Sequence, residues 1–130
     1  MTNLDRKLVL VPGQVALADL RELYFSPLTV ELAEDAWAKV ESCCAAVDAI
    51  VESGKTVYGI NTGFGLLAQT RIPDEQLAEL QKNLVLSHSA GVGDDLEESV
   101  VRLMMSLKVI SLSRGYSGVR PVIIQTLIQC

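Results

Sequence analysis

A tyrosine inside a glycine-rich stretch is the residue of this sequence best suited to chemistry. The stretch runs Tyr58-Gly-Ile-Asn-Thr-Gly-Phe-Gly65. Each glycine raises the entropy lost on ordering, so we expect a loop here rather than a helix or a strand. A loop of this kind can open and shut, and its backbone can approach a ligand closely. We therefore predict a mobile lid that carries Tyr58 as a catalytic acid or base.

Two interpretations of Tyr58 stay open on the residues alone. Free tyrosine loses its phenolic proton only near pH ~10, so a base at neutral pH needs nearby cations or oriented donors. Lys55 is the one cation close to it in the sequence. The alternative is a structural tyrosine, partly buried in the loop, whose hydroxyl bonds to a carbonyl.

The second candidate is the single histidine, His88, together with its neighbour Ser87. His88 falls on the helical stripe of Leu77, Leu80 and Leu84, where a hydrogen-bonded core histidine is the common arrangement. Its other possible role is to bind a ligand near the end of that helix. Ser87 could bond one ring nitrogen or face a ligand itself.

Several other kinds of site are excluded. Gly63-Phe64-Gly65 lacks both the spacing of a dinucleotide fingerprint and the Gly-Lys-Ser/Thr ending of a phosphate-binding loop. The cysteines, Cys43, Cys44 and Cys130, are odd in number and two are adjacent, so they predict no disulfide framework and fit a reducing cytoplasm. No Cys-x-x-Cys motif accompanies the lone histidine, so we predict no metal site. We interpret the Cys43-Cys44 pair as buried helix packing.

Length, composition and charge define the class of protein. The chain has 130 residues, 49% of them hydrophobic but only 5% aromatic, which indicates one domain, or a piece of one, with an aliphatic core. The net charge of −5 argues against a nucleic-acid or anionic-membrane partner. No signal-peptide pattern or bilayer-spanning stretch occurs, so we predict a cytoplasmic protein.

The elements that must position these residues are mainly helices, so the predicted fold class is mainly α. Two short apolar segments, 8–11 and 28–32, predict a small two-stranded β element near the N-terminus. Helical spacing predicts helices at 17–23, at 34–53, from Asp74 to Gly91, from Asp94 or Asp95 to Arg114-Gly115, and from Pro121 onward. The fourth of these is apolar over much of its circumference, which indicates packing on more than one side.

The last helix reaches Cys130 without a cap or a stop glycine. We interpret residues 1–130 as an N-terminal segment truncated within a helix, part of a larger helical-bundle enzyme. Its apolar residues Val122, Ile123, Leu127 and Ile128 would lie exposed, which predicts self-association.

Three blocks in order make the chain resemble the N-terminal part of the aromatic amino acid ammonia-lyase family, most closely its histidine-directed members. They are the Tyr58–Gly65 stretch, Leu80-Gln-Lys-Asn-Leu-Val-Leu-Ser-His-Ser-Ala-Gly91, and Ser111-Leu-Ser-Arg-Gly-Tyr-Ser-Gly-Val-Arg120. The resemblance covers nearly the whole chain. It implies a lyase that removes ammonia from an L-amino acid, giving urocanate from histidine.

By this resemblance Tyr58 would be the base that takes a proton from the substrate's β-carbon, and Gly65 would line the substrate's path. Substrate choice in the family follows the pair matched by Ser87-His88. Phenylalanine-directed members tend to have Phe-Leu there and tyrosine-directed members His-Leu, so Ser-His fits histidine. A site built for polar groups also rejects apolar analogues strongly.

The family's electrophile, methylidene-imidazolone, forms from an internal Ala-Ser-Gly. This sequence has none, and Ser89-Ala90-Gly91 has the wrong order. Family active sites are assembled from several subunits of a homotetramer, so we expect the segment alone to be inactive. Two alternatives stay open: a segment of a lyase or aminomutase acting on tyrosine or another amino acid, and a non-catalytic helical assembly module.

Overall fold

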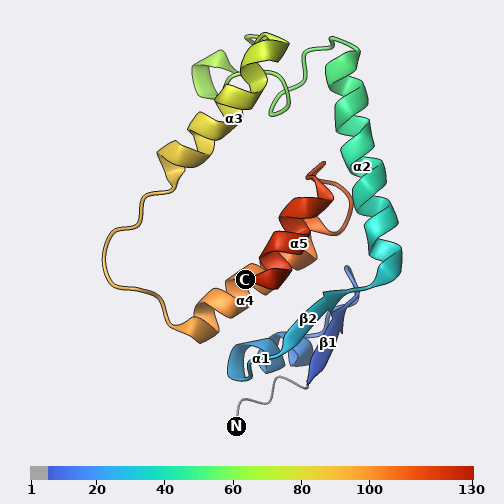
Figure 1. The fold of residues 1–130 in the computed structure, drawn as a ribbon, viewed down its shortest axis with the longest axis vertical. Helices are drawn as coiled ribbons and strands as arrows, with labels where there is room; N and C mark the ends of the chain where they lie inside the picture. Colours follow the sequence, from blue (N-terminus) through green and yellow to red (C-terminus); the bar gives the residue numbers. More distant parts are fainter. Residues whose placement is uncertain (1–5) are drawn as a thin grey trace. The chain divides into compact units, whose positions relative to one another are not determined.

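The computed structural model describes residues 6–130, which divide into two compact units. The first unit contains residues up to Ala46 and from Asp95 to Cys130, and the second contains Val47–Asp94. The described part holds five α-helices and one small sheet, which confirms the mainly α prediction (Figure 1). The boundary between the units falls within helix α2, Glu34–Glu52.

The sheet of the first unit pairs β1, Lys7–Leu10, with β2, Thr29–Leu32. The strands are parallel, with Lys7 opposite Thr29 and Leu10 opposite Leu32. Parallel neighbours need a crossover connection, and helix α1, Leu17–Phe25, provides it. The predicted two-stranded β element is therefore confirmed, with one residue of difference at some of the strand ends.

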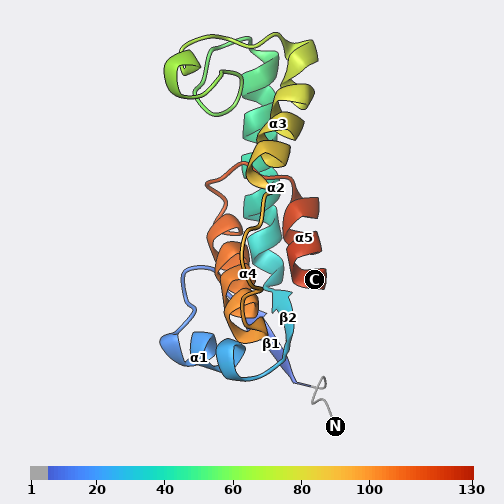
Figure 2. The same ribbon diagram turned by 90° about the vertical axis from the view of Figure 1, so that its left-hand side faces the viewer.

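Two further helices complete the first unit: α4, Glu98–Leu112, and α5, Pro121–Gln129. α4 packs against both α1 and α5, and both ribbon views show α4 and α5 side by side (Figures 1 and 2). This explains its wide apolar surface. The apolar core of the unit is aliphatic, as predicted, and consists of Leu10, Leu23, Leu32, Ala36, Val40, Val109 and Ile124.

Polar contacts also join elements of the first unit. The Arg102 guanidinium of α4 donates to the carbonyls of Leu23 (2.7 Å) and Tyr24 (2.9 Å) at the C-terminal end of α1. α1 has no basic residue in its own last turn, so Arg102 supplies the positive charge that a helix C-terminus favours. Cys43 is half-buried and its Sγ accepts from the Gly118 N–H, so its predicted packing role fits, although it is not fully buried.

The second unit holds the last residues of α2, a loop, a short 3-10 turn at Gly65–Leu67 and helix α3, Asp74–His88. Two predicted boundaries were wrong. α3 ends at His88 rather than at Gly91, and α4 begins at Glu98 rather than after an Asp94 or Asp95 cap. The N-cap of α4 is Glu97, and its side chain makes no capping hydrogen bond.

Candidate functional site

Tyr58 lies in the turn that follows α2 and points its ring outward. Its side chain is 63% exposed, and its ring meets the Phe64 ring edge to face, with centroids 6.0 Å apart. Within residues 6–130 the phenolic hydroxyl has no hydrogen-bond partner. The structural alternative, a partly buried tyrosine bonded to a carbonyl, is therefore wrong. The hydroxyl is free to meet a ligand.

Beneath this exposed ring the loop is held by a buried asparagine that the sequence analysis did not single out. Asn61 is 0% exposed. Its Oδ1 accepts from the Val57 N–H (2.8 Å), and its Nδ2 donates to the Lys55 carbonyl (2.7 Å). Asparagine side chains commonly bond to nearby backbone in turns, so its place in a glycine-rich loop was the available clue.

Thr62 supports the other side of Tyr58. It is 1% exposed, and its Oγ1 accepts from the Gly59 N–H at 3.4 Å and donates to the Gly63 carbonyl at 3.0 Å. The N–H groups of the residues before and after Tyr58 are therefore both bound by buried polar side chains. The ring projects from a turn whose inner side is fixed.

The far end of the loop is tied back to its start. The Asn61 carbonyl accepts from the Ile72 N–H (2.9 Å), and Thr62 and Arg71 form an isolated antiparallel bridge. The Arg71 guanidinium donates to the Gly54 carbonyl just after α2 (2.9 Å). These bonds restrict the base of the loop, so any lid motion must involve its exposed part.

Gly65 occupies the exposed part of the loop with a positive φ of +58°. No heavy atom lies within 4 Å of the position where a Cβ would stand. The backbone conformation, rather than crowding, therefore accounts for glycine here. The open space above it leaves room for a ligand to approach, as the predicted role of Gly65 requires.

Ser87 and His88 lie in the last turn of α3, and both are exposed. Of the two interpretations of His88, the core histidine was wrong: Leu77, Leu80 and Leu84 are half-buried, whereas His88 is exposed. His88 Nδ1 lies 2.9 Å from both the Leu84 carbonyl and Ser87 Oγ, and that Oγ also donates to the Leu84 carbonyl. A carbonyl can only accept, so this arrangement favours a proton on Nδ1. Nε2 is then left as an outward acceptor.

Tyr58, Gly65, Ser87 and His88 all belong to the second unit. No hydrogen bond or ring contact in the described part of the chain joins Tyr58 to the Ser87-His88 pair. Nor does any described cation lie over the Tyr58 ring, since the cation–π contacts are those of Arg21 with Phe25 and Arg114 with Tyr116. The structure thus provides two separate polar elements without the group that would activate the phenol.

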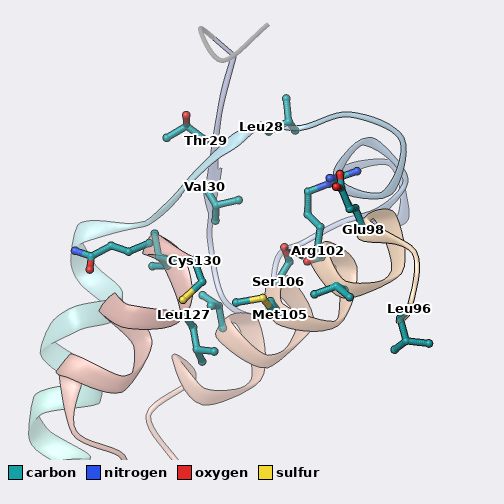
Figure 3. Close-up of a pocket in the computed structure, with 14 residues that line it drawn as sticks. Leu28, Thr29, Val30, Leu96, Glu98, Arg102, Met105, Ser106, Leu127 and Cys130 are labelled. Atoms are coloured by element: carbon teal, nitrogen blue, oxygen red, sulfur yellow. Dashed lines mark hydrogen bonds between the residues drawn. The ribbon is translucent and has the colours of Figure 1, made fainter. Parts of the chain in front are cut away.

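A cavity of about 620 Å³ lies in the first unit, and none of the predicted site residues lines it. Figure 3 shows its lining side chains, among them Val30 of β2, Met105 of α4 and Leu127 of α5. Arg102 also lines it, but its guanidinium is bonded to α1, and Ser106 Oγ donates to a carbonyl of its own helix. Because Arg102 and Ser106 are bonded within the fold and no predicted site residue lines this cavity, it is a poor candidate for the reaction site.

The described residues offer neither a metal site nor a membrane-spanning helix. Residues 6–130 contain no cluster of three or more histidine, cysteine or carboxylate side chains able to hold a metal ion. No helix in this range has both the length and the apolar character needed to cross a membrane. The candidate site is therefore the loop of Tyr58 together with the end of α3.

Comparison with known sequences gives consistent matches. The model of the aromatic amino acid lyase family matches residues 15–130. A histidine ammonia-lyase of Pseudomonas fluorescens is 54% identical over 119 residues, and one of Idiomarina loihiensis is 52% identical over 120 residues. Each alignment covers 92% of this chain but only 23% and 24% of those proteins. The chain thus spans about a quarter of the length of these relatives.

Solved structures agree with the sequence matches. Histidine ammonia-lyase from Trypanosoma cruzi superimposes with a TM-score of 0.84 at 38% identity, covering 95% of this chain and 24% of that one. Tyrosine aminomutase from Streptomyces globisporus gives a TM-score of 0.86 at 29% identity, covering 95% and 23%. The fold is common to both, while the higher sequence identity is with the histidine enzyme.

Proposed function

Because the chain belongs to the aromatic amino acid lyase family, we propose that it is the N-terminal segment of an enzyme that eliminates ammonia from L-histidine to give urocanate. Histidine ammonia-lyases match it at more than 50% identity over 92% of its length. The observation that carries the proposal is the outward, unbonded phenol of Tyr58 on a loop with a fixed inner side.

Tyr58 acts as the base that takes the proton from the substrate's β-carbon. A positioned general base contributes about 10²–10⁴-fold to a rate. The phenol must first lose its own proton, and near neutral pH this requires cations or donors directed at its oxygen. In this proposal they come from residues outside this segment, since within residues 6–130 no group donates a hydrogen bond to the phenolic oxygen.

His88 and Ser87 bind the substrate's imidazole. Nε2 of His88 is left as an acceptor by the bonds at Nδ1, so it can receive an N–H of the substrate ring. Ser87 fixes that arrangement through its contact with Nδ1. A leucine at position 88 would leave the substrate's N–H unpaired, which a polar site penalises strongly. Gly65 lets the substrate pass close to the backbone.

The electrophile fits this segment only as a group supplied from outside it. The sequence has no Ala-Ser-Gly from which methylidene-imidazolone could form, while the exposed faces of Tyr58, Gly65 and His88 are free to surround a site completed by other residues. When present, the group draws electrons from the substrate and makes its β-proton more acidic. The segment's own residues bind the substrate and remove that proton.

The complete enzyme is cytoplasmic and assembles as a homotetramer in this proposal. Val122 and Ile123 of α5 are 49% and 40% exposed, whereas Leu127 and Ile128 are half-buried against the core of the first unit. Such exposed apolar side chains are suited to self-association. The 130-residue chain by itself produces no urocanate.

A substrate competition tests this assignment. The full-length protein that carries this segment is supplied with L-histidine and L-tyrosine together, and both elimination products are followed by chromatography. We expect urocanate to predominate, and His88→Leu to lower kcat/KM for L-histidine by about 100-fold or more because the imidazole loses its partner. Asn83→Leu, a change at an exposed position of the same helix, is the matched control.

Two outcomes would contradict the assignment. Preferential conversion of L-tyrosine, or formation of a β-amino acid, would place the protein with the aminomutases that share the fold. A full-length protein that is folded and tetrameric but inactive on every amino acid supplied would support the non-catalytic assembly module instead.

A further inference from the structure

The hydrogen bonds of the buried Asn61 fix the backbone turn that holds Tyr58. Tyr58 lies between Val57 and Asn61, and the side chain and backbone of Asn61 both bond to Val57. Asn61 Oδ1 accepts from the Val57 N–H at 2.8 Å, and the Asn61 N–H donates to the Val57 carbonyl at 3.2 Å. Asn61 thus closes a tight turn with Tyr58 at its exposed edge.

The second half of the amide connects this turn to the chain that enters it. Nδ2 donates to the Lys55 carbonyl at 2.7 Å, and the Asn61 carbonyl accepts from Ile72 N–H at 2.9 Å. Asn61 is completely buried, so water cannot replace these bonds. One residue therefore joins the entry, the turn and the exit of the loop.

The site requires an asparagine in particular. A donor and an acceptor are both needed at the end of a short side chain: the acceptor for an N–H and the donor for a carbonyl. Aspartate offers two acceptors, glutamine is one methylene longer, and threonine has a single hydroxyl. Neighbouring Thr62 adds a longer bond, 3.4 Å, to the Gly59 N–H.

We propose that Asn61 is the positioning residue for Tyr58: its buried amide fixes the turn and thereby holds the phenol toward the substrate. This inference rests on the proposed function, because it gives Tyr58 the role of base. Asn61 itself touches no reacting atom, since it is buried beneath the turn while the phenol is 63% exposed.

A double-mutant cycle in the full-length protein tests the proposal. Asn61→Ala and Tyr58→Phe are made singly and together, and kcat and KM for L-histidine are measured. A displacement of a catalytic group by about 1 Å can cost about 100-fold, so we expect Asn61→Ala to lower kcat by about 10- to 100-fold. KM should change by less than about threefold, because the residues proposed to bind the substrate's imidazole, Ser87 and His88, lie on α3.

In the Tyr58→Phe background Asn61→Ala should cause no further loss of kcat, since the base that it positions is already absent. Gln76→Ala, which removes an exposed amide from the first turn of α3, should leave all parameters unchanged. An equal loss from Asn61→Ala in both backgrounds would show that the residue acts through the general fold, and would overturn the proposal.

Asn61→Asp provides a second test that survives if the alanine variant fails to fold. The introduced carboxyl keeps the shape and the acceptor, but when ionised it faces the Lys55 carbonyl without a proton to donate. When protonated it can make both bonds. Its activity relative to the unsubstituted protein, measured at each pH, should therefore rise as the pH falls. A ratio that stays constant with pH would overturn the proposal.

The cycle also distinguishes the proposed role of Tyr58 as base from the proposed role of Asn61 as its positioning residue. Full turnover by Tyr58→Phe would overturn the proposed base and the positioning role with it. Slow turnover by Tyr58→Phe together with full turnover by Asn61→Ala would overturn only the positioning role.

Discussion

The two units of the chain are held by different physical means. In the first unit most buried side chains are aliphatic, such as Leu23 and Ile124, each 0% exposed, and the two buried serines, Ser106 and Ser113, bond only to carbonyls of α4. In the second unit the side chains described as buried are polar, those of Asn61 and Thr62. Apolar burial stabilises the one, and hydrogen bonds from side chain to backbone shape the other.

Because of this difference, the stability of the protein and the aiming of Tyr58 depend on different units. Apolar burial is non-directional and fixes a volume, whereas hydrogen bonds depend on distance and angle and fix the direction of a group. A loop that holds a phenol toward a substrate must fix the orientation of that side chain, and hydrogen bonds do this better than apolar packing. Substitutions in the first unit should therefore change the free energy of unfolding, and substitutions around Tyr58 should change turnover.

The largest effect is expected at Tyr58. Tyr58→Phe in the full-length protein should lower kcat for L-histidine by about 10²–10⁴-fold, because it removes the base and nothing else. The melting temperature should stay within a few degrees, since the hydroxyl has no bond within the described residues. Tyr116→Phe, at a tyrosine 84% exposed in the first unit, is the control and should leave kcat unchanged.

In the core of the first unit, a substitution should lower the free energy of unfolding instead of kcat. Leu23→Ala creates a cavity in a completely buried position and should lower the free energy of unfolding by about 2–5 kcal/mol. Leu17→Ala on the same helix, where the side chain is 81% exposed, should cost less than about 1 kcal/mol. Denaturant unfolding of the full-length variants measures both. Equal losses would show that α1 is not held by this core.

A smaller loss is expected at Gly115, where the segment after α4 meets α2. A Cβ there would lie 2.9 Å from the Lys39 carbonyl oxygen, and φ is +77°. Gly115→Ala should cost about 1–3 kcal/mol from overpacking and backbone strain. Gly13→Ala is a matched control, because its φ is +89° but its Cβ would meet no atom within 4 Å. If both cost the same, the contact with Lys39 contributes nothing.

The smallest effect is expected from an exposed ion pair of the second unit. A guanidinium nitrogen of Arg71 lies 3.4 Å from Oδ1 of Asp74, and the two side chains are 44% and 55% exposed. Asp74→Asn should therefore lower the free energy of unfolding by less than about 1 kcal/mol, and added salt should reduce even that. A loss above 2 kcal/mol would show that charges, and not Asn61, hold the loop.

Much of the first unit follows from the sequence. The period of apolar residues and the position of Pro121 predict its helices, because burial on one helical face leaves that pattern. The parallel pairing of β1 and β2 follows from the helix between them. The start of α4 was misplaced because acidic side chains at Asp94 and Asp95 resemble caps, while the backbone begins the helix after Glu97 without a side-chain cap.

The candidate site was less predictable. The apolar stripe of α3 favours a buried His88, but within the described residues only Leu77, Leu80 and Leu84 of that stripe are half-buried and His88 is exposed, so periodicity alone does not give its environment. Asn61 was overlooked because its role depends on two hydrogen-bond distances, which spacing along the chain does not reveal. Tyr58 was found because its residue type and its glycine neighbours are visible in the sequence.

If Tyr58 is the base, its phenolic oxygen must face the substrate. A crystal structure of the full-length protein with a non-reactive histidine analogue bound would show this. We expect the phenolic oxygen within about 3–3.5 Å of the analogue's β-carbon, the separation of reacting atoms in a productive complex. A phenol turned away from the analogue and packed into the protein would contradict the role of Tyr58 as the base.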